Sequence, residues 1–428
     1  MPTRTTYVYM HLSEGPVPAG RLDMTEEGRN SYATFQYGNR YLGRSNRVAV
    51  DPAVLPLPDP DATPQTFRTA EGFELFNGIR DAAPDGWGRY LMHKAAGTQN
   101  LTEFDYLIAS GNQRVGALAF GPDPVGGPKR MAPWGEEGAV GEQFDLAELA
   151  EAAERIQSVE QLEPDLKLLL EAGSSLGGAR PKAAMIHDGV PWIAKFSAKS
   201  DTYAVCRAEF AVMRLAKECE LDIPETDFKT LLNRDIYLIR RFDRNIKDSQ
   251  LARIPFASAL TMLEAHEIAA HEYSYREIAE VLRRYGADPR RDLRELFRRM
   301  AFNILVGNDD DHLRNHAFLY DGRDWRLSPL YDVVPRPHVG SRGRLILGVG
   351  DSGHDATLAN ALSGTANFGL KREEAAALLE DLRERVNNRW HAALTEAGLG
   401  RVDIERLASC FAEAGKSDWQ KDSLGPPL

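Results

Sequence analysis

The stretch Gly307-Asn308-Asp309-Asp310-Asp311-His312-Leu313-Arg314-Asn315 carries the densest chemistry in the chain: three adjacent carboxylates, then a histidine, a cation and an amide. Three neighbouring aspartates would repel one another in a packed core. The stretch is therefore a solvated turn, a metal site or part of a phosphoryl-transfer centre, and the turn is the simplest of these. What decides among them is the chemistry that the rest of the chain places beside it.

A second acidic motif, Ser328-Pro329-Leu330-Tyr331-Asp332, favours the phosphoryl-transfer interpretation. Protein kinases use a catalytic Asp and a metal-binding Asn in the spacing Asp-x-x-x-x-Asn, followed later by a second metal-binding Asp. Asp310 and Asn315 have this spacing, whereas Asp309 and Asp311 each miss it by one residue and receive no role. A hairpin predicted over residues 316–330 returns the chain toward Asp332, so that Asn315 and Asp332 can share one cation.

The composition indicates a globular protein with more than one lobe. The chain has 428 residues, 43% of them hydrophobic, which is enough for two or three lobes with cores. Its net charge of -11 repels nucleic acid, so any DNA contact would come through a basic patch or a basic partner. Arginines between residues 283 and 299 alternate with acids, which favours a salt-bridged face over a nucleic-acid patch.

The chain shows no pattern of a secreted or membrane-spanning protein. Cys206, Cys219 and Cys410 are too widely spaced for a disulfide framework or a zinc site and fit a reducing cytosol. The N-terminus turns polar too soon for a secretory signal, and there is no run of roughly 18 apolar residues. We expect a cytoplasmic protein without a membrane segment.

The segment 173–182, Gly-Ser-Ser-Leu-Gly-Gly-Ala-Arg-Pro-Lys, is the second informative stretch. Its glycines let backbone N–H groups turn inward, and its cations can neutralise phosphates. It is not a Walker A loop, because Ala-Arg-Pro separates the glycine pair from Lys182, and a simple connecting loop remains an alternative. The hairpin signal Asp188-Gly189 then places Lys195 on a strand, where a kinase keeps its phosphate-binding lysine or where a lysine snorkels from a sheet edge.

The rest of the chain divides into a β-rich beginning and a helical end. Tyr7–Leu12 is predicted as a strand with Ala33–Tyr37 as its neighbour, and residues 54–60 are too proline-rich for a central strand. Residues 83–89, Ala-Pro-Asp-Gly-Trp-Gly-Arg, are predicted to form a turn that leads into a helix. Taken alone, they also fit an ordinary loop around a buried tryptophan. Helices are predicted over 257–270, 275–285, 291–306 and 371–394.

The ordered motifs resemble the HipA family of bacterial serine/threonine kinase toxins. The motifs are Ser-x-Gly-Gly-Ala-Arg-Pro-Lys, the strand lysine, Arg-Phe-Asp-Arg, Asp-x-His-x-x-Asn and Pro-Leu-Tyr-Asp, and residues 83–89 are similar to that family's first lobe. The resemblance implies an α+β, protein-kinase-like fold with a β-rich N-terminal lobe and a mainly helical C-terminal lobe. It implies an N-terminal subdomain over 1–125, a nucleotide-binding lobe over 126–245 and a helical lobe over 246–428.

The resemblance also implies roles for individual residues. Asp310 would be the catalytic base, Asn315 and Asp332 would bind Mg2+, and Ser175, next to Ser174, would be the autophosphorylated serine that switches the kinase off. The residues implied to bind ATP are Gly177, Gly178, Ala179, Arg180, Pro181, Lys182 and Lys195 at the phosphates, Arg240, Arg241 and Phe242 at the adenine, and His312, Leu313, Arg314, Asn315, Tyr331 and Asp332.

The function implied by the resemblance is transfer of the ATP γ-phosphate to a Ser or Thr of a protein, an aminoacyl-tRNA synthetase, which arrests growth. The implied partner is a helix-turn-helix antitoxin of the HipB type, through which alone the complex would touch DNA. Two alternatives stay open: a catalytically silent nucleotide-binding co-repressor or scaffold, and a small-molecule kinase of related fold.

Overall fold

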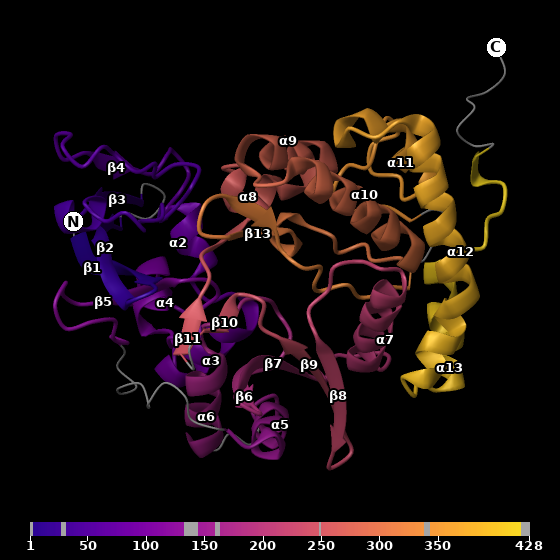
Figure 1. Ribbon diagram of the computed structural model, residues 1–428. Coiled ribbons are helices and arrows are strands. Elements are labelled where there is room, and N and C mark those ends of the chain that lie inside the picture. The colour runs from indigo at the N-terminus through magenta and orange to yellow at the C-terminus, as the bar shows by residue number, and fades with distance from the viewer. Residues whose placement is uncertain are drawn as a thin grey trace. The chain divides into compact units, whose positions relative to one another are not determined.

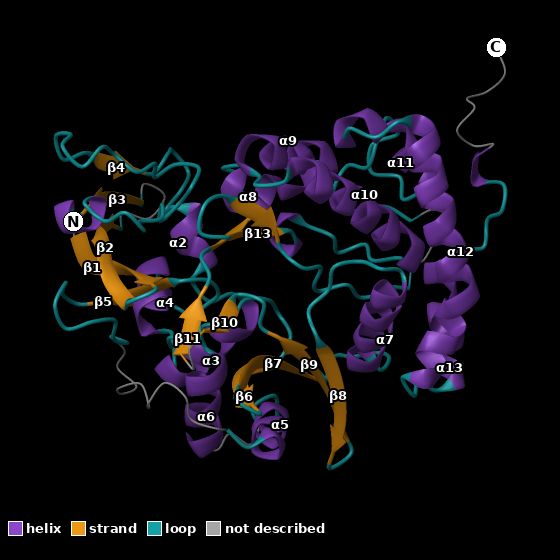
Figure 2. Cartoon of the chain, viewed as in Figure 1, coloured by secondary structure: helices purple, strands orange, loops and turns teal. Residues whose placement is uncertain are grey.

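The computed structural model describes residues 3–26, 31–131, 144–158, 163–247, 250–337 and 343–420. The chain divides into two compact units, the first formed by Met1–Lys199 with Thr230–Ala257 and the second by Ser200–Lys229 with Ser258–Leu428. Figure 1 colours the chain by residue number, and Figure 2 colours it by secondary structure. Most strands belong to the first unit and most helices to the second. The predicted α+β class is confirmed. The finer division at residues 125 and 245 stays a prediction.

An antiparallel sheet of five described strands opens the first unit, in the order β4-β3-β2-β1-β5. The strands are β1 (Thr3–Leu12), β2 (Gly15–Thr25), β3 (Tyr32–Tyr37), β4 (Thr66–Arg68) and β5 (Leu118–Gly121). The prediction that Ala33–Tyr37 neighbours the first strand is wrong, because β2 lies between them. Its Pro16 and Pro18 argue against a central strand. They fit because β3 pairs with β2 only from Gly20 onward, so the start of β2 is an edge.

Four helices of the first unit connect β3 to β5: α1 (Asn39–Leu42), α2 (Asn77–Asp81), α3 (Gly86–Ala96) and α4 (Glu103–Ala109). As predicted, a turn at residues 83–85 leads into α3, where Asp85 accepts a hydrogen bond from Gly86 N as the N-cap. Thr102 and Asp105 form a capping box at α4. Residues 54–60 form no strand beyond an isolated bridge at Leu55, as their prolines predict.

A second antiparallel sheet of the first unit contains β6 (Lys182–His187), β7 (Val190–Phe196) and β9 (Arg234–Arg240), paired in that order. The predicted hairpin between β6 and β7 is confirmed: Asp188 and Gly189 have φ of 51° and 74°, the positive values that a type I′ turn requires. The helices α5 (Leu146–Arg155) and α6 (Glu163–Gly173) share a hydrophobic core with this sheet and with α3. Trp87 of α3 lies in that core.

Four further strands lie where the chain passes between the units or close to these crossings. They are β8 (Thr226–Leu231), β10 (Arg244–Lys247), β11 (Gln250–Arg253) and β12 (Phe256–Ser258). β10 and β11 pair with each other as an antiparallel hairpin.

The second unit is mainly helical. Its helices are α7 (Val205–Glu218), α8 (Ala259–Met262), α9 (Tyr275–Tyr285), α10 (Pro289–Val306), α11 (Leu358–Ser363), α12 (Arg372–Glu396) and α13 (Arg401–Leu407), with short 3-10 segments at Glu267–Glu272, Leu313–Asn315, Thr365–Phe368 and Ala408–Phe411. α7 packs on α12, and α10 packs on α9 and α12. The predicted hairpin after Asn315 is confirmed as β13 (Ala317–Tyr320) and β14 (Trp325–Leu327).

The helix predictions for the second unit are confirmed with one exception. α9, α10 and α12 match the predicted ranges closely. The continuous helix predicted over 257–270 is wrong, because α8 ends at Met262 and a 3-10 segment begins only at Glu267. Glu264 between them has a φ of 52°, a left-handed conformation that a helix of L-residues cannot continue through.

The arginine-rich face of α9 and α10 is salt-bridged, as the alternation of charges predicts. Arg283 pairs with Glu280 and Arg299 with Glu295, each at 3.0 Å, and Arg294 pairs with Glu374 of α12. These cations are therefore already matched by carboxylates of the chain itself.

The last features of the fold concern the cysteines and the lengths of the helices. The three cysteines are free and buried, and no helix in the described ranges has the length and apolar character that crossing a bilayer demands.

Candidate functional site

The acidic loop begins where α10 ends. Gly307 closes the helix in the left-handed conformation, with φ of 63°. A Cβ at this position would also lie 2.8 Å from the backbone and side chain of Cys410. Glycine is therefore required at residue 307 both by its backbone conformation and by the space around it, and the loop leaves α10 in a defined direction.

The most deeply buried aspartate of the loop is Asp311, only 1% exposed. Its carboxylate accepts hydrogen bonds from Tyr275 Oη and, at 2.7 Å, from His316 Nε2. Burial, and then the charge of Asp311, raise the pKa of Tyr275 well above its ordinary value, so that its hydroxyl remains a donor. Asn303 Nδ2 donates to Tyr275 Oη at 3.0 Å. Asp311, which receives no role from the sequence, thus anchors the loop to α9 and α10.

Asp310 and Asp309 are more accessible, with side chains 36% and 33% exposed. Asp310 Oδ2 lies 2.6 Å from Arg336 Nη2, and the Asp310 carbonyl oxygen accepts a hydrogen bond from Asn315 Nδ2 at 2.9 Å. Asp310 and Asn315, whose spacing suggests a base followed by a metal ligand, are therefore in direct contact through a hydrogen bond to the Asp310 backbone. Of the three aspartates, Asp310 alone combines an accessible carboxylate with a bond to Asn315.

The hairpin β13–β14 brings the two ends of the predicted metal site together. Tyr331 Oη donates to the Arg314 carbonyl oxygen at 2.6 Å, so the residues beside Asn315 and Asp332 are in contact. Asp332 has a φ of 59°, a conformation that costs energy outside glycine and is concentrated at functional sites. The geometry of the second unit thus joins the two acidic motifs that the sequence singles out.

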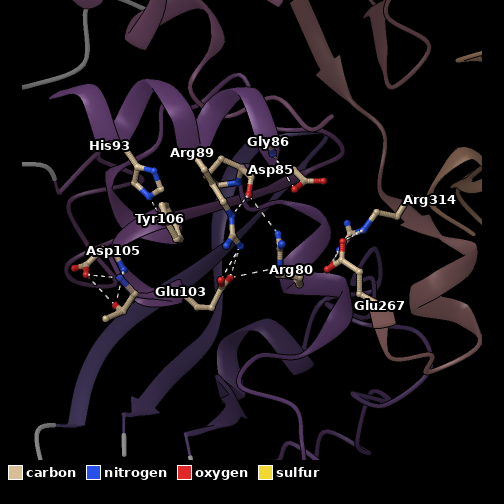
Figure 3. A network of polar contacts seen from close by, with 12 residues as sticks. Arg80, Asp85, Gly86, Arg89, His93, Glu103, Asp105, Tyr106, Glu267 and Arg314 are labelled. Carbon is tan, nitrogen blue, oxygen red and sulfur yellow. Dashed lines mark hydrogen bonds and ion pairs between the residues drawn. The ribbon is translucent and has the colours of Figure 1, made fainter. Parts of the chain in front are cut away.

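The short helix Leu313–Asn315 is held from both sides. His312 caps it, because its Nδ1 accepts a hydrogen bond from Arg314 N at 3.2 Å, and Leu313 is fully buried. The Arg314 side chain pairs with Glu267 at 3.3 Å, as Figure 3 shows. These contacts fix the backbone on which Asn315 sits.

Asn315 and Asp332 are the predicted Mg2+ ligands, and their chemistry fits that ion. Mg2+ takes oxygen ligands and is commonly held by one or two protein side chains together with substrate phosphates and water. Because Asn315 Nδ2 donates to the Asp310 backbone, Oδ1 is the atom of that amide able to coordinate a cation. Among the described residues, no three His, Cys, Asp or Glu side chains gather into a metal site of their own.

The glycine-rich loop lies in the first unit between α6 and β6. Lys182 Nζ donates to the Gly177 carbonyl oxygen at 2.7 Å and thereby folds back across the loop. Gly178 has a φ of 86°, and a Cβ there would lie 2.5 Å from Lys182 Nζ. Glycine at 178 is therefore what permits the lysine to reach this position. Of the other implied phosphate-binding residues, Ala179 is exposed, Arg180 is half-buried and Pro181 is buried.

The two lysines expected at the phosphates face each other. Lys182 on β6 is directly opposite Lys195 on β7 in the antiparallel register, and the two are 8% and 6% exposed. Opposed residues of such a pair project from the same face of the sheet, and like charges there repel. Lys195 Nζ also lies 5.9 Å from the centre of the Tyr237 ring. Two ammonium groups on one face of the sheet, at the end of the glycine-rich loop, would both attract an anion that binds there.

The beginning of α3 holds the glycine-rich loop, a contact that the sequence does not reveal. Trp87 N donates to the Gly178 carbonyl oxygen at 2.9 Å, and Trp87 Nε1 donates to the Lys182 carbonyl oxygen at 3.0 Å. A Cβ on Gly86 would lie 2.8 Å from Ala179 Cα, and one on Gly88 would collide with the Ser174 carbonyl oxygen. Both glycines of the 83–89 motif therefore allow backbone to meet backbone.

A polar network fixes the turn that precedes α3, as Figure 3 shows. Arg89 donates to Glu103 at 2.8 Å and to the Pro84 carbonyl oxygen at 3.2 Å, and its guanidinium lies 4.2 Å from the Tyr106 ring centre. Arg80 donates to the same carbonyl oxygen at 3.3 Å and lies 3.4 Å from Glu103. These contacts hold residues 83–89 rigidly at the start of α3, and we call this motif the α3 wedge. The sequence signal that identifies it is its pair of glycines around a tryptophan.

The residues implied at the adenine, Arg240–Phe242, form the end of β9 and the turn after it. The Arg241 guanidinium is buried and donates to Asp243 and to two carbonyl oxygens of the segment 113–116, each of these two at 2.8 Å. Burial alone would raise the pKa of Asp243, but the guanidinium groups of Arg241 and Arg244 hold it below its ordinary value. The Arg241 side chain therefore ties β9 to this segment, and a nucleotide contact of residues 240–242 stays a prediction.

Family models match the parts of the chain that contain each of the two loops. Residues 174–390 match the HipA-like C-terminal domain, and residues 10–121 match the HipA N-terminal domain. The first match contains most of the glycine-rich loop, Lys195 and both acidic motifs. The second contains the α3 wedge.

Individual relatives and a solved structure agree with this assignment. Y4mE of Sinorhizobium fredii, named as a candidate kinase, is 26% identical over 336 residues, which are 72% of this chain and 73% of that protein. Y4dM of the same organism, named likewise, is 25% identical over 331 residues, 74% of each chain. HipA of the Shewanella oneidensis MR-1 toxin-antitoxin system, solved with HipB and its operator DNA, has a TM-score of 0.69 and 17% identity, covering 98% of this chain and 100% of that one. The kinase-like fold predicted from the sequence is thereby confirmed. The protein belongs to the HipA family and is a kinase-like member that carries both the N-terminal and the C-terminal domain of that family.

Proposed function

We propose that this protein is an ATP-dependent serine/threonine protein kinase and the toxin of a toxin-antitoxin module. The observation that carries the proposal is the cross-strand pair of buried lysines, Lys182 and Lys195, at the end of the glycine-rich loop. Two ammonium groups on the same face of the sheet would together attract an anion that binds there. The phosphates of ATP supply that anion, and residues 177–182 and Lys195 bind them.

The proposed reaction uses Asp310 as the base. As the hydroxyl oxygen of the acceptor Ser or Thr bonds to the γ-phosphorus, its proton passes to the Asp310 carboxylate, and the bond from phosphorus to the departing ADP oxygen breaks. The glycine-rich loop and the two lysines hold the phosphates and spread the developing negative charge. Mg2+, when bound through Asn315 and Asp332, supplies further positive charge at the phosphates. The remaining implied nucleotide contacts are Arg240–Phe242, His312, Leu313, Arg314 and Tyr331.

The proposal is tested by comparing two neighbouring aspartates in a phosphorylation assay. The wild type, Asp310→Asn and Asp309→Asn are each incubated with labelled ATP, Mg2+ and a bacterial lysate. Asp310→Asn should lose roughly 10²-fold or more of phosphate transfer, because the general base is gone, and should still bind ATP. Asp309→Asn should keep its activity.

Three outcomes would contradict the proposal. Undiminished transfer by Asp310→Asn would remove the base assignment. ATP binding without turnover by the wild type would indicate a silent co-repressor or scaffold, and label on a metabolite would indicate a small-molecule kinase.

We extend the proposal to a partner and a target. The Shewanella HipA was solved with HipB and operator DNA. The net charge of -11 opposes direct DNA contact, so a helix-turn-helix antitoxin of the HipB type would supply the basic surface. A gel-shift assay should show no DNA binding by this chain alone and binding by the complex. The proposed substrate is an aminoacyl-tRNA synthetase, and a panel of purified synthetases with labelled ATP tests this directly.

Autophosphorylation at Ser175 completes the proposal. Ser175 is 3% exposed, and its buried Oγ makes no hydrogen bond within the described residues. Ser174 Oγ, in contrast, donates to the Leu170 carbonyl oxygen at 2.5 Å and accepts from Gly111 N at 3.0 Å. Modification of Ser175 would sacrifice no hydrogen bond. A phosphate would not fit the buried position, so the loop would have to leave it, which accounts for loss of activity.

A further inference from the structure

The segment that follows Asp332 runs back along the acidic loop. Arg336 N donates to the Gly307 carbonyl oxygen at 3.0 Å, which fixes the backbone of residue 336 beside the start of that loop. One residue earlier, the Pro335 carbonyl oxygen accepts a hydrogen bond from Tyr203 Oη at 2.7 Å. The backbone on which Arg336 sits is thus held by two long-range hydrogen bonds.

The Arg336 side chain reaches the two accessible aspartates. Its Nη2 lies 2.6 Å from Asp310 Oδ2, and its Nε lies 3.8 Å from Asp309 Oδ1. The buried carboxylate of Asp311 is engaged elsewhere, by Tyr275 and His316. One guanidinium therefore serves the part of the acidic run that faces away from the core.

The bond to Oδ2 has a consequence for the other oxygen of the same carboxylate. A charge-assisted hydrogen bond is short and directional, so it restricts rotation of the Asp310 carboxylate about the Cβ–Cγ bond. Without it, the repulsion between Asp309 and Asp310 would turn the two carboxylates apart. With Oδ2 held, Oδ1 is presented in one orientation.

We propose that Arg336 is a positioning residue for phosphoryl transfer, which holds Asp310 Oδ2 so that Oδ1 can receive the proton of the acceptor hydroxyl. The positive charge of Arg336 also reduces the repulsion between the carboxylates of Asp309 and Asp310 and the phosphates of an incoming nucleotide. This inference rests on the proposed function, because it takes Asp310 as the base. It adds a cation that lies outside the motifs singled out from the sequence.

The variant that tests the proposal should remain folded. The Arg336 side chain is 49% exposed, and ion pairs at such exposure contribute little to stability. Arg336→Ala should therefore show an unchanged thermal unfolding midpoint. Arg323→Ala is the matched control, because Arg323 also pairs with an aspartate, Asp324 at 3.9 Å, but is 92% exposed on the hairpin turn.

Steady-state kinetics separate positioning from a merely structural role. Arg336→Ala should lower kcat by about 10- to 100-fold, the order expected when a reacting group is misplaced, and leave the KM for ATP within about twofold. Arg336→Lys should recover part of kcat, because it restores the charge without the forked geometry. Arg323→Ala should behave as the wild type.

The outcomes distinguish this inference from the proposed function. If Arg336→Ala keeps or raises kcat while Asp310→Asn abolishes it, the positioning role of Arg336 is refuted and the kinase assignment stands. If the fall appears as a higher KM for ATP with kcat unchanged, Arg336 acts on nucleotide binding and the positioning role is likewise refuted. An inactive wild type would overturn both.

Discussion

The glycine-rich loop and the acidic loop are held in place by opposite means. Residues 173–182 are fixed by close approach of backbone, with Trp87 and two glycines of α3 fitted against carbonyl groups. Residues 307–315 are fixed by side chains, through the buried carboxylate of Asp311 and its donors. The first arrangement depends on the absence of side-chain volume and the second on hydrogen-bonding groups.

The difference predicts how each loop responds to change. In the glycine-rich region an added methyl group should be more harmful than a lost hydroxyl, because backbone cannot retreat from a collision. In the acidic loop, removal of one buried acceptor should be the severe change, because its donors remain in the protein without a partner. The predictions below test this contrast, beginning with the largest effect.

The largest effect on stability is expected for Asp311→Ala. The substitution leaves the Tyr275 hydroxyl and the His316 ring N–H buried without their acceptor, and should lower the free energy of unfolding by roughly 3 kcal/mol. Asp309→Ala, at a side chain 33% exposed, should change it by no more than about 0.5 kcal/mol. Urea denaturation of both variants measures the difference. Equal losses would show that Asp311 does not anchor the loop.

An intermediate effect is expected for Gly88→Ala. Alanine raises helix propensity by about 1 kcal/mol, but its Cβ would lie 2.8 Å from Pro84 Cβ and collide with the Ser174 carbonyl oxygen. The collision should cost about 2 kcal/mol net and weaken ATP binding, because the glycine-rich loop must shift.

Gly43→Ala is the control for this substitution, since its nearest neighbour would be an ordinary 3.7 Å away. Chemical denaturation and equilibrium ATP binding provide the two readouts. Unchanged ATP affinity in Gly88→Ala would mean that α3 supports the fold but not the loop.

The smallest effect on stability is expected at the adjacent serines. Ser174→Ala removes two hydrogen bonds of Oγ and should cost about 1 kcal/mol, whereas Ser175→Ala removes none and should be close to neutral. Mass spectrometry after incubation with ATP should show the phosphate missing from Ser175→Ala and present in Ser174→Ala. The reverse pattern would assign the modification to Ser174.

Much of the fold follows from local chemistry. The Asp188-Gly189 turn, the turn that leads into α3 and the apolar periodicity of α9 are read within a few residues and are confirmed. The errors occur where strand pairing or an unforeseen backbone conformation decides the structure. β2 tolerates its prolines because β3 pairs only with its second half, and the predicted helix over 257–270 breaks at Glu264.

The candidate site shows the same division. The spacing of Asp310 and Asn315 predicts their proximity, and the structure shows a direct hydrogen bond between them. No spacing indicates that Asp311 turns inward to Tyr275, or that Trp87 reaches Lys182, because these contacts join residues far apart in the chain. The pattern of residues 83–89 is recognisable in the sequence, but its contact with the glycine-rich loop is not.

The sequence by itself determined the α+β class, the hairpin that carries Lys195, the hairpin between the two predicted metal ligands, and the kinase-like order of the motifs. Only the tertiary structure decided which aspartate is buried, which cation meets Asp310 and what supports the glycine-rich loop. The physical reason is the distance along the chain over which each effect acts. Turn conformation, capping and periodicity act over a few residues, whereas burial and ion pairing depend on which distant segments pack together.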